Sequence, residues 1–215
     1  MKPVYLQLSE AVEKLPCGAS HFFGNPDLPS EYDYPVYLDE KGNEHPYVFI
    51  CQINLEEVAP YDVDNVLPHG GMLLFFAKID TYLGDYISDD IIGGVISDTS
   101  AVKVLHFPSC KNLREVVYMN GESCRTVPHE LKIDFHADLM HVSDEHALLA
   151  HPTYRPWENW DAPYEDWMIL LQVDSFEGKD FQLNLMDVGV LDFLISPSDL
   201  KQHSFDNVRA IVLSS

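Results

Sequence analysis

The sequence predicts a mainly β protein with a roll-like sheet, a few short helices and a pseudo-symmetric duplication of one half-sized unit. Three observations lead to this fold class. Short runs rich in β-branched and aromatic residues recur along the 215 residues. They are not separated by the regular helices of about 10–15 residues that a parallel βαβ winding requires. Three motifs also occur twice, in the same order.

The apolar runs give the individual elements. We expect strands at 47–53, 72–77, 95–96, 101–107, 132–135, 167–173, 190–195 and 208–213. Apolar residues at helical spacing predict a short helix over 5–14, and further short helices are expected at 111–118, 143–150 and 197–202. The last of these has a serine available as N-cap at Ser196 or Ser198.

The duplication rests on matched segments. YVFICQINLEE at 47–57 aligns with WMILLQVDSFE at 167–177, so that Gln52 corresponds to Gln172. Upstream, FFGNP at 22–26 corresponds to LLAHP at 148–152, and downstream GMLLF at 71–75 corresponds to GVLDF at 189–193. We therefore expect one domain over residues 1–215, made of two fused repeats at about 1–120 and 121–215, since each repeat alone would have a marginal core.

Charge is the strongest compositional signal. The chain has 13 Lys and Arg against 35 Asp and Glu, a formal net charge of −22, and Lys41 is the one Lys or Arg among ten acids between residues 17 and 77. Such a field repels phosphate, so we expect neither nucleic acid nor an anionic membrane as partner. A basic protein fits it, and the candidate docking face comprises Glu31, Asp33, Asp39 and Glu40.

The compartment follows from what the sequence lacks. No apolar run approaches the roughly 20 residues of a membrane span, and the first residues do not form a secretory signal. The cysteines at 17, 51, 110 and 124 are widely spaced and read as reduced thiols. We expect a cytosolic protein.

At the duplicated motifs the chain resembles the YwqG-like family of bacterial proteins, for which no activity is established. The resemblance covers nearly the whole chain and lies in FGNPDLP (23–29), CQINLEE (51–57), PHGGMLLFF (68–76), HALLAHP (146–152), LLQVD (170–174), DVGVL (187–191) and FDNV (205–208). It implies a mainly β, roll-like, duplicated architecture. The family often has Gly at Ala150 and Trp-Gly in place of Leu185 and Met186 before Asp187, departures that would alter any ligand site there.

Signatures of known chemistry are missing. The sequence contains no P-loop, no nucleophile elbow and no HExxH zinc motif, and the DVDN stretch at 62–65 lacks the glycine of a calcium loop. His136, His141, His146 and His151 recur every five residues, a spacing that does not gather imidazoles on one face of a helix or strand. We therefore expect no metal, no cofactor and no catalytic residue.

Candidate contacts lie near the duplicated strands. Gln52 and Gln172, with Asn54 and Asp174 beside them, could bridge backbone strands or contact a small molecule at the junction of the repeats. Further candidates are His146, Asp187 and the aromatic side chains Trp157 and Trp160. The aromatic cluster would either cap the core or form a docking platform.

Three functions are compatible with these patterns. The first is a non-catalytic interaction protein whose acidic surface docks a basic partner; the resemblance adds an immunity-type role as one version. The second is a small-molecule or carbohydrate binder with an aromatic-lined groove between the repeats. The third is an uncatalogued hydrolase that uses His146 with Asp144 or Glu145.

Overall fold

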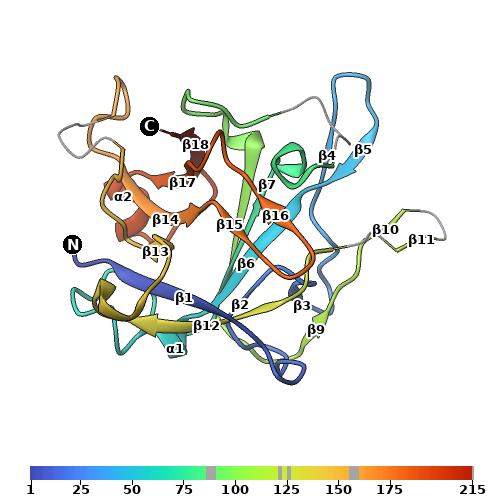
Figure 1. Ribbon diagram of the computed structural model, residues 1–215, viewed down its shortest axis with the longest axis horizontal. Helices are drawn as coiled ribbons and strands as arrows, with labels where there is room; N and C mark the ends of the chain where they lie inside the picture. Colours follow the sequence, from blue (N-terminus) through green and yellow to red (C-terminus); the bar gives the residue numbers. More distant parts are fainter. Residues whose placement is uncertain (86–90, 121–122, 125–126, 155–159, 215) are drawn as a thin grey trace.

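The computed structural model describes residues 1–85, 91–120, 123–124, 127–154 and 160–214. Their main feature is a ten-stranded antiparallel sheet that curls around a central core (Figure 1). In spatial order its strands are β18 (Arg209–Leu213), β17 (Val190–Ile195), β14 (Met168–Asp174), β13 (Ala147–Leu148), β1 (Val4–Glu10), β12 (Leu131–His136), β2 (His21–Phe22), β6 (Val48–Asn54), β7 (Met72–Ala77) and β8 (Val102–Phe107). The mainly β fold class is confirmed.

Short two-stranded ribbons and short helices make up the other described elements. Four two-stranded ribbons pair β3 (Asp27–Pro29) with β9 (Leu113–Glu115), β4 (Val36–Leu38) with β5 (Glu44–Pro46), β10 (Met119–Asn120) with β11 (Ser123–Cys124), and β15 (Phe176–Glu177) with β16 (Gln182–Leu183). The described helices are α1 (Leu55–Val58), α2 (Pro197–Lys201) and the 3₁₀ turns η1 (Asp80–Leu83), η2 (Thr99–Ala101) and η3 (Leu139–His141). None of them has the length and apolar character that a bilayer crossing requires.

The strand order is symmetric about the central pair β1 and β12, which confirms the duplication. β2, β6, β7 and β8 in the first repeat correspond to β13, β14, β17 and β18 in the second. The registers match as well, because Gln52 pairs with His21 and Gln172 with Ala147. Gln52 and Gln172 therefore occupy equivalent positions, as predicted. That the whole chain is one domain stays a prediction.

The first strand of each repeat is exchanged. β1 pairs with β13 of the second repeat, β12 pairs with β2 of the first, and β1 and β12 pair with each other at the centre. Figure 1 shows these two strands side by side in the lower part of the view. Each repeat thus completes its sheet with a strand from the other.

A β-bulge recurs in both repeats and decides which side chains face inward. It lies between Phe49 and Cys51 in β6 and between Ile169 and Leu171 in β14. Phe49 and Ile169 are buried in clusters on the outer face, whereas Cys51 and Leu171 lie in the central core. Residues two apart across the bulge therefore face opposite sides, because the extra residue of a bulge reverses the side on which following residues project.

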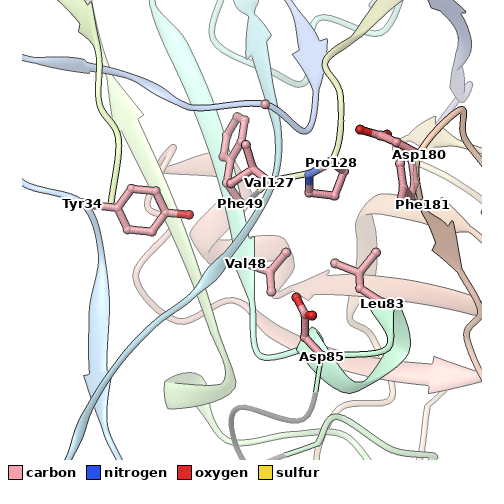
Figure 2. A pocket seen from close by; sticks show the side chains of 10 residues that line it. Tyr34, Val48, Phe49, Leu83, Asp85, Val127, Pro128, Asp180 and Phe181 are labelled. Carbon is pink, nitrogen blue, oxygen red and sulfur yellow. The ribbon is translucent and has the colours of Figure 1, made fainter. Parts of the chain in front are cut away.

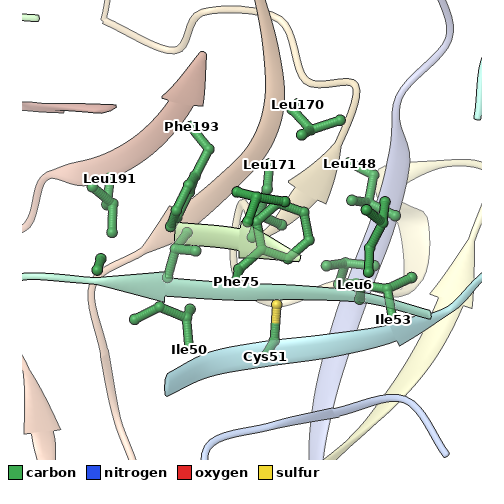
Figure 3. Close-up of a cluster of buried hydrophobic side chains, with 14 of the residues drawn as sticks. Leu6, Ile50, Cys51, Ile53, Phe75, Leu148, Leu170, Leu171, Leu191 and Phe193 are labelled. Carbon is green, nitrogen blue, oxygen red and sulfur yellow. The ribbon is translucent and has the colours of Figure 1, made fainter. Parts of the chain in front are cut away.

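The central core fills the curl of the sheet. It contains residues from both repeats, and Figure 3 shows Phe75 of β7 beside Phe193 of β17, with ring centroids 5.2 Å apart. Two outer clusters cover the backs of the strands, one on each repeat. A side chain at Gly71 would meet the Phe107 carbonyl oxygen at 2.0 Å, and one at Gly189 the Leu213 oxygen at 2.2 Å, so both β7 and β17 need a preceding glycine.

Several predicted elements need correction. The helix expected over 5–14 is strand β1, and those expected over 111–118 and 143–150 contain only the short strands β9 and β13. In β1 the buried residues are Val4 and Leu6, whereas Val12, an apolar residue within the expected helix, is fully exposed. The expected strand at 95–96 is irregular and lies next to β18, with the Ser97 amide donating to the Ala210 carbonyl. The α2 helix and its Ser196 cap are confirmed.

Candidate functional site

A hairpin of the second repeat reaches over the first. The β15–β16 hairpin packs Phe176 and Phe181 against Phe23, with ring centroids 6.0 and 4.8 Å apart. Just after the hairpin, the Asn184 amide donates to the carbonyl of Tyr82 at 3.0 Å. These contacts place the hairpin turn, with Asp180, beside the segment 127–130 that leads into β12. The two repeats therefore meet here as well as at the exchanged strands.

An open groove follows this junction. It consists of a cavity of about 180 Å³ and a larger one of about 430 Å³, which share Gly24, Val127, Pro128 and Asp180. Figure 2 shows the first cavity, with side chains of the first repeat, of 127–128 and of 180–181 surrounding one space. We call the two cavities together the junction groove.

The two ends of the junction groove differ chemically. The smaller cavity is bounded by the rings of Tyr34, Phe49 and Phe181 (Figure 2), and the Tyr34 hydroxyl donates to the Tyr47 carbonyl at 3.0 Å. Five carboxylates line the groove, and Lys14 is the one lysine or arginine among the described lining residues. The carboxylates belong to Glu13, Asp85, Glu115, Glu130 and Asp180.

Lys14 is already paired. Its ammonium group contacts the carboxylate of Glu115, and Asn25 donates to the same carboxylate at 3.0 Å. These contacts lower the pKa of Glu115 and raise that of Lys14, so both remain charged at neutral pH. The described lining of the junction groove therefore presents a negative potential, and Lys14, at its rim, is held by Glu115.

The predicted glutamines serve as bridges within each repeat. Gln52 accepts from the Asp27 amide at 2.8 Å and donates to the Ala19 carbonyl at 2.9 Å, and it is fully buried. Gln172 donates to the Glu145 carbonyl at 2.9 Å and accepts from the Thr153 hydroxyl at 3.2 Å. The two amides lie in separate halves of the sheet. The structure places neither of them in the junction groove.

The neighbouring polar residues repeat the same pattern. The backbone amide of Asn54 donates to the Ser20 hydroxyl at 2.8 Å, and that of Asp174 donates to Nδ1 of His146 at 3.0 Å. The Asn54 side chain also accepts from the Glu56 amide and so caps α1. These hydrogen bonds give both residues structural roles at the end of their strands.

His146 is inaccessible. Its imidazole is fully buried, with ring centroids 5.3 Å from Phe22 and 4.9 Å from Phe176, and its Nε2 has no hydrogen-bond partner. Burial lowers the pKa of His146 to about 4, so the ring is neutral at physiological pH. A hydrolase mechanism would need this imidazole to reach a substrate, and its position between two phenylalanine rings prevents that.

The aromatic candidates cap the second repeat. Trp160 is 5% exposed, donates from its indole nitrogen to the Trp167 carbonyl at 3.0 Å, and packs on the outer cluster with Ile169 and Leu194. Its face is therefore not a docking platform. Trp157 lies outside the described residues.

Asp187 lies in an exposed left-handed turn. Three consecutive residues, Met186, Asp187 and Val188, have φ angles of 45°, 59° and 69°, and the Gly189 amide closes the turn on the Leu185 carbonyl. Left-handed backbone is costly for residues with a Cβ, and most for a β-branched one. The family pattern of Trp-Gly would place glycine at Met186, within this turn. The other departure, Ala150, packs in the outer cluster of the second repeat.

This strain predicts a stabilising substitution. Val188 is 69% exposed, so Val188→Gly loses little packing while it removes a Cβ from a left-handed residue. We expect the free energy of unfolding in urea to rise by about 1 kcal/mol. The control is Val117→Gly at an exposed valine of ordinary φ, which should destabilise the fold. Equal destabilisation by both variants would contradict the assignment.

The predicted acidic face is only partly available. Glu31, Asp33 and Glu40 are exposed. Asp39 instead organises the β4–β5 turn, since its carboxylate accepts from the Lys41 and Asn43 amides, from the Asn43 side chain and from His45. These bonds hold the pKa of Asp39 well below its usual range.

No metal site emerges within the part of the chain that the structure describes, where no three His, Cys, Asp or Glu side chains are grouped to hold an ion. Cys51 is buried and Cys17 and Cys110 are free thiols. The residues that line the junction groove, Asp180, Phe181, Glu115 and Pro128 among them, were not predicted as site residues. Their one signal in the sequence is charge, because Glu and Asp recur among them, in both repeats.

Fold and groove together define a duplicated β-sheet protein with an acidic cleft at the junction of its repeats. Residues 20–212 match the family model described as Domain of unknown function (DUF1963), and the chain belongs to that family. No curated protein matches the chain.

Proposed function

We propose that this protein is a non-catalytic cytosolic binding module that takes a basic segment of a partner protein into the junction groove. The observation that carries the proposal is the groove's lining, in which the described residues supply five carboxylates against Lys14, in a cavity system of about 180 and 430 Å³. A segment with lysine or arginine side chains would neutralise those carboxylates, and an apolar side chain would enter the cavity beside Tyr34 and Phe181. The proposal includes membership of the YwqG-like group within the family.

Net charge supports the same class of partner. At −22 the whole molecule attracts cations, and the exposed Glu31, Asp33 and Glu40 add to the field of the first repeat. Long-range attraction of this kind accelerates encounter and is weakened by salt, because screening shortens to about 8 Å at physiological ionic strength. The association rate should therefore fall as salt is added.

The test uses a defined probe. A fluorescein-labelled peptide that contains several lysines and one phenylalanine is titrated with the protein, and binding is followed by anisotropy. The double charge reversal Glu13→Lys and Asp180→Lys, at the groove, should weaken binding at least about tenfold. The matched reversal Glu165→Lys and Asp206→Lys, at exposed acids that do not line the groove, should change it by less than about threefold.

Other outcomes decide against the proposal. Equal effects of the two double reversals would mean that the peptide senses net charge alone. Binding of a neutral sugar or other uncharged small molecule in the groove, with no binding of the peptide, would favour the second of the three candidate functions.

A further inference from the structure

A small pocket opens from the acidic end of the junction groove. It has a volume of about 90 Å³ and shares Lys14, Asn25, Glu115 and Glu130 with the larger cavity. Its other lining residues include Cys17, His21 and Asp27. We call it the anchor pocket. Its volume corresponds to about three water molecules, which is space for the end of one side chain but not for a ring system.

His21 supplies an unused hydrogen-bond acceptor to the anchor pocket. The residue is 3% exposed, and its Nδ1 lies 2.8 Å from the Phe23 carbonyl oxygen. A carbonyl only accepts, so Nδ1 carries the proton and Nε2, on the other edge of the ring, has a free lone pair. No described residue donates to Nε2. Burial lowers the pKa of His21, which keeps this lone pair available at neutral pH.

Two carboxylates with fixed positions complete the acceptor set. Asp27 is 6% exposed, and its Oδ2 accepts from the Gly18 amide at 2.8 Å and from Gln52 at 2.7 Å. Glu130 accepts from the Leu15 amide at 3.2 Å. Cys17 stays a neutral thiol, because burial and the nearby Asp27 raise its pKa to about 11. The anchor pocket therefore combines three acceptors on separate elements.

The duplication provides an internal comparison. The equivalent cavity of the second repeat, about 150 Å³, is lined by Ala147 where the first has His21 and by Thr153 where it has Asp27. Pro3, which precedes the residue paired with Leu148, stands where Glu130 stands in the first repeat. Glu145 and His151 line this second cavity from other positions, so the fold is built in the second repeat without an imidazole or a carboxylate at the three equivalent positions.

We propose that the anchor pocket binds the ε-ammonium group of a lysine side chain from the basic segment, with His21, Asp27 and Glu130 as acceptors. An ammonium has three donors and no acceptor, which matches three separate acceptors better than the planar fork of a guanidinium does. Lys14, paired with Glu115 at the mouth, is a resident cation that the incoming lysine competes with. This inference rests on the proposed function, because it names the group that the groove's ligand inserts.

The first measurement uses Nα-acetyl-lysine amide with the full chain labelled at histidine with ¹⁵N. Binding should shift the His21 Nε2 resonance in the direction of an acceptor that gains a hydrogen bond, and the shift should saturate. The Nε-acetylated compound, which lacks the charge, should leave the resonance unchanged. An arginine analogue that binds as tightly as the lysine compound would overturn the ammonium assignment.

Two mild substitutions test the same pocket. Glu130→Gln keeps the side-chain shape and an oxygen for the Leu15 amide, and it should weaken binding of the lysine compound about tenfold. Lys14→Met removes the resident cation and should strengthen binding up to about fivefold. The control is Lys111→Met, an exposed lysine outside the pocket, which should have no effect. Unchanged melting temperatures would show that the fold is intact.

The two proposals fail in different ways. If the lysine-rich peptide binds and the Glu13 and Asp180 reversal weakens it, but Glu130→Gln and Lys14→Met leave its affinity unchanged, the anchor pocket is wrong and the proposed function stands. If the lysine compound binds at His21 but the peptide does not bind, the pocket stands and the proposed function fails.

Discussion

Truncation of Phe75 to alanine should lower the free energy of unfolding by about 3–5 kcal/mol. Phe75 is fully buried in β7, and its ring meets that of Phe193 from the equivalent strand of the other repeat (Figure 3). The substitution removes the ring and leaves a cavity at the place where the two repeats pack. Urea unfolding followed by circular dichroism measures the loss.

The same experiment has internal controls. Phe193→Ala should cost a similar amount, and the double variant should cost less than the sum, because each single change already removes the contact between the rings. Leu38→Ala, at an exposed position of β4, should change stability by less than about 0.5 kcal/mol. Unfolding curves like that of the unmodified protein for both phenylalanine variants would refute the packing.

Replacement of Asp192 by leucine should stabilise the protein by about 3 kcal/mol at pH 7. Asp192 lies in β17, its carboxyl is fully buried, and neither oxygen has a hydrogen-bond partner. The equivalent residue of the first repeat, which pairs with Gln52 as Asp192 pairs with Gln172, is the buried Leu74. The fold therefore accommodates leucine at this register in its other half.

The pH dependence identifies the cause. Burial raises the pKa of Asp192 well above that of an exposed carboxyl, so the folded state holds a proton that the unfolded state releases above about pH 4. The unfolded state then binds fewer protons, and this residue's contribution lowers stability as pH rises toward the folded pKa. The gain from Asp192→Leu should accordingly shrink on going from pH 7 to pH 4. Asp192→Asn, similar in volume, tests the charge alone; a gain independent of pH in both variants would exclude this explanation.

Much of the fold could be predicted because the strands are apolar enough to be seen locally. The runs that became β6, β7, β14 and β17 are buried along nearly their whole length, so no helical or loop interpretation competes with them. The duplication was also visible, because Gln52 and Gln172 interrupt those runs at the same place. The two glutamines have equivalent strand partners, His21 and Ala147, and each bridges neighbouring backbone segments.

The exchanged strands could not be predicted. β1 contains only two fully buried residues, Val4 and Leu6, and its partners are more than a hundred residues away along the chain. Local spacing favoured a helix, and long-range pairing overrode it. The bulges at Phe49 and Ile169 could not be predicted either, because nothing in the local sequence marks the extra residue. They change which side chains of β6 and β14 face the core.

The candidate site was predicted less well than the fold. The net charge predicted a basic partner but not the groove. The residues that line the groove come from segments that are brought together only by the β15–β16 hairpin and the exchanged strands. Asp180 and Glu115, 65 positions apart, line the same cavity. His146, which looked chemically promising beside two acids, is enclosed between Phe22 and Phe176. Burial of that kind depends on tertiary packing and not on the residue's neighbours in sequence.

The position of β1 also sets the order in which the molecule can be assembled during synthesis. Strand β1, Val4–Glu10, is synthesised before both of its partners and finds them only when residues 131–148 have followed it. At about 5–20 residues per second, the nascent chain spends several seconds with this strand unpaired. The first repeat must meanwhile expose the edge of β2 that β12 later covers. These contacts between distant parts of the chain make slow folding the expected behaviour.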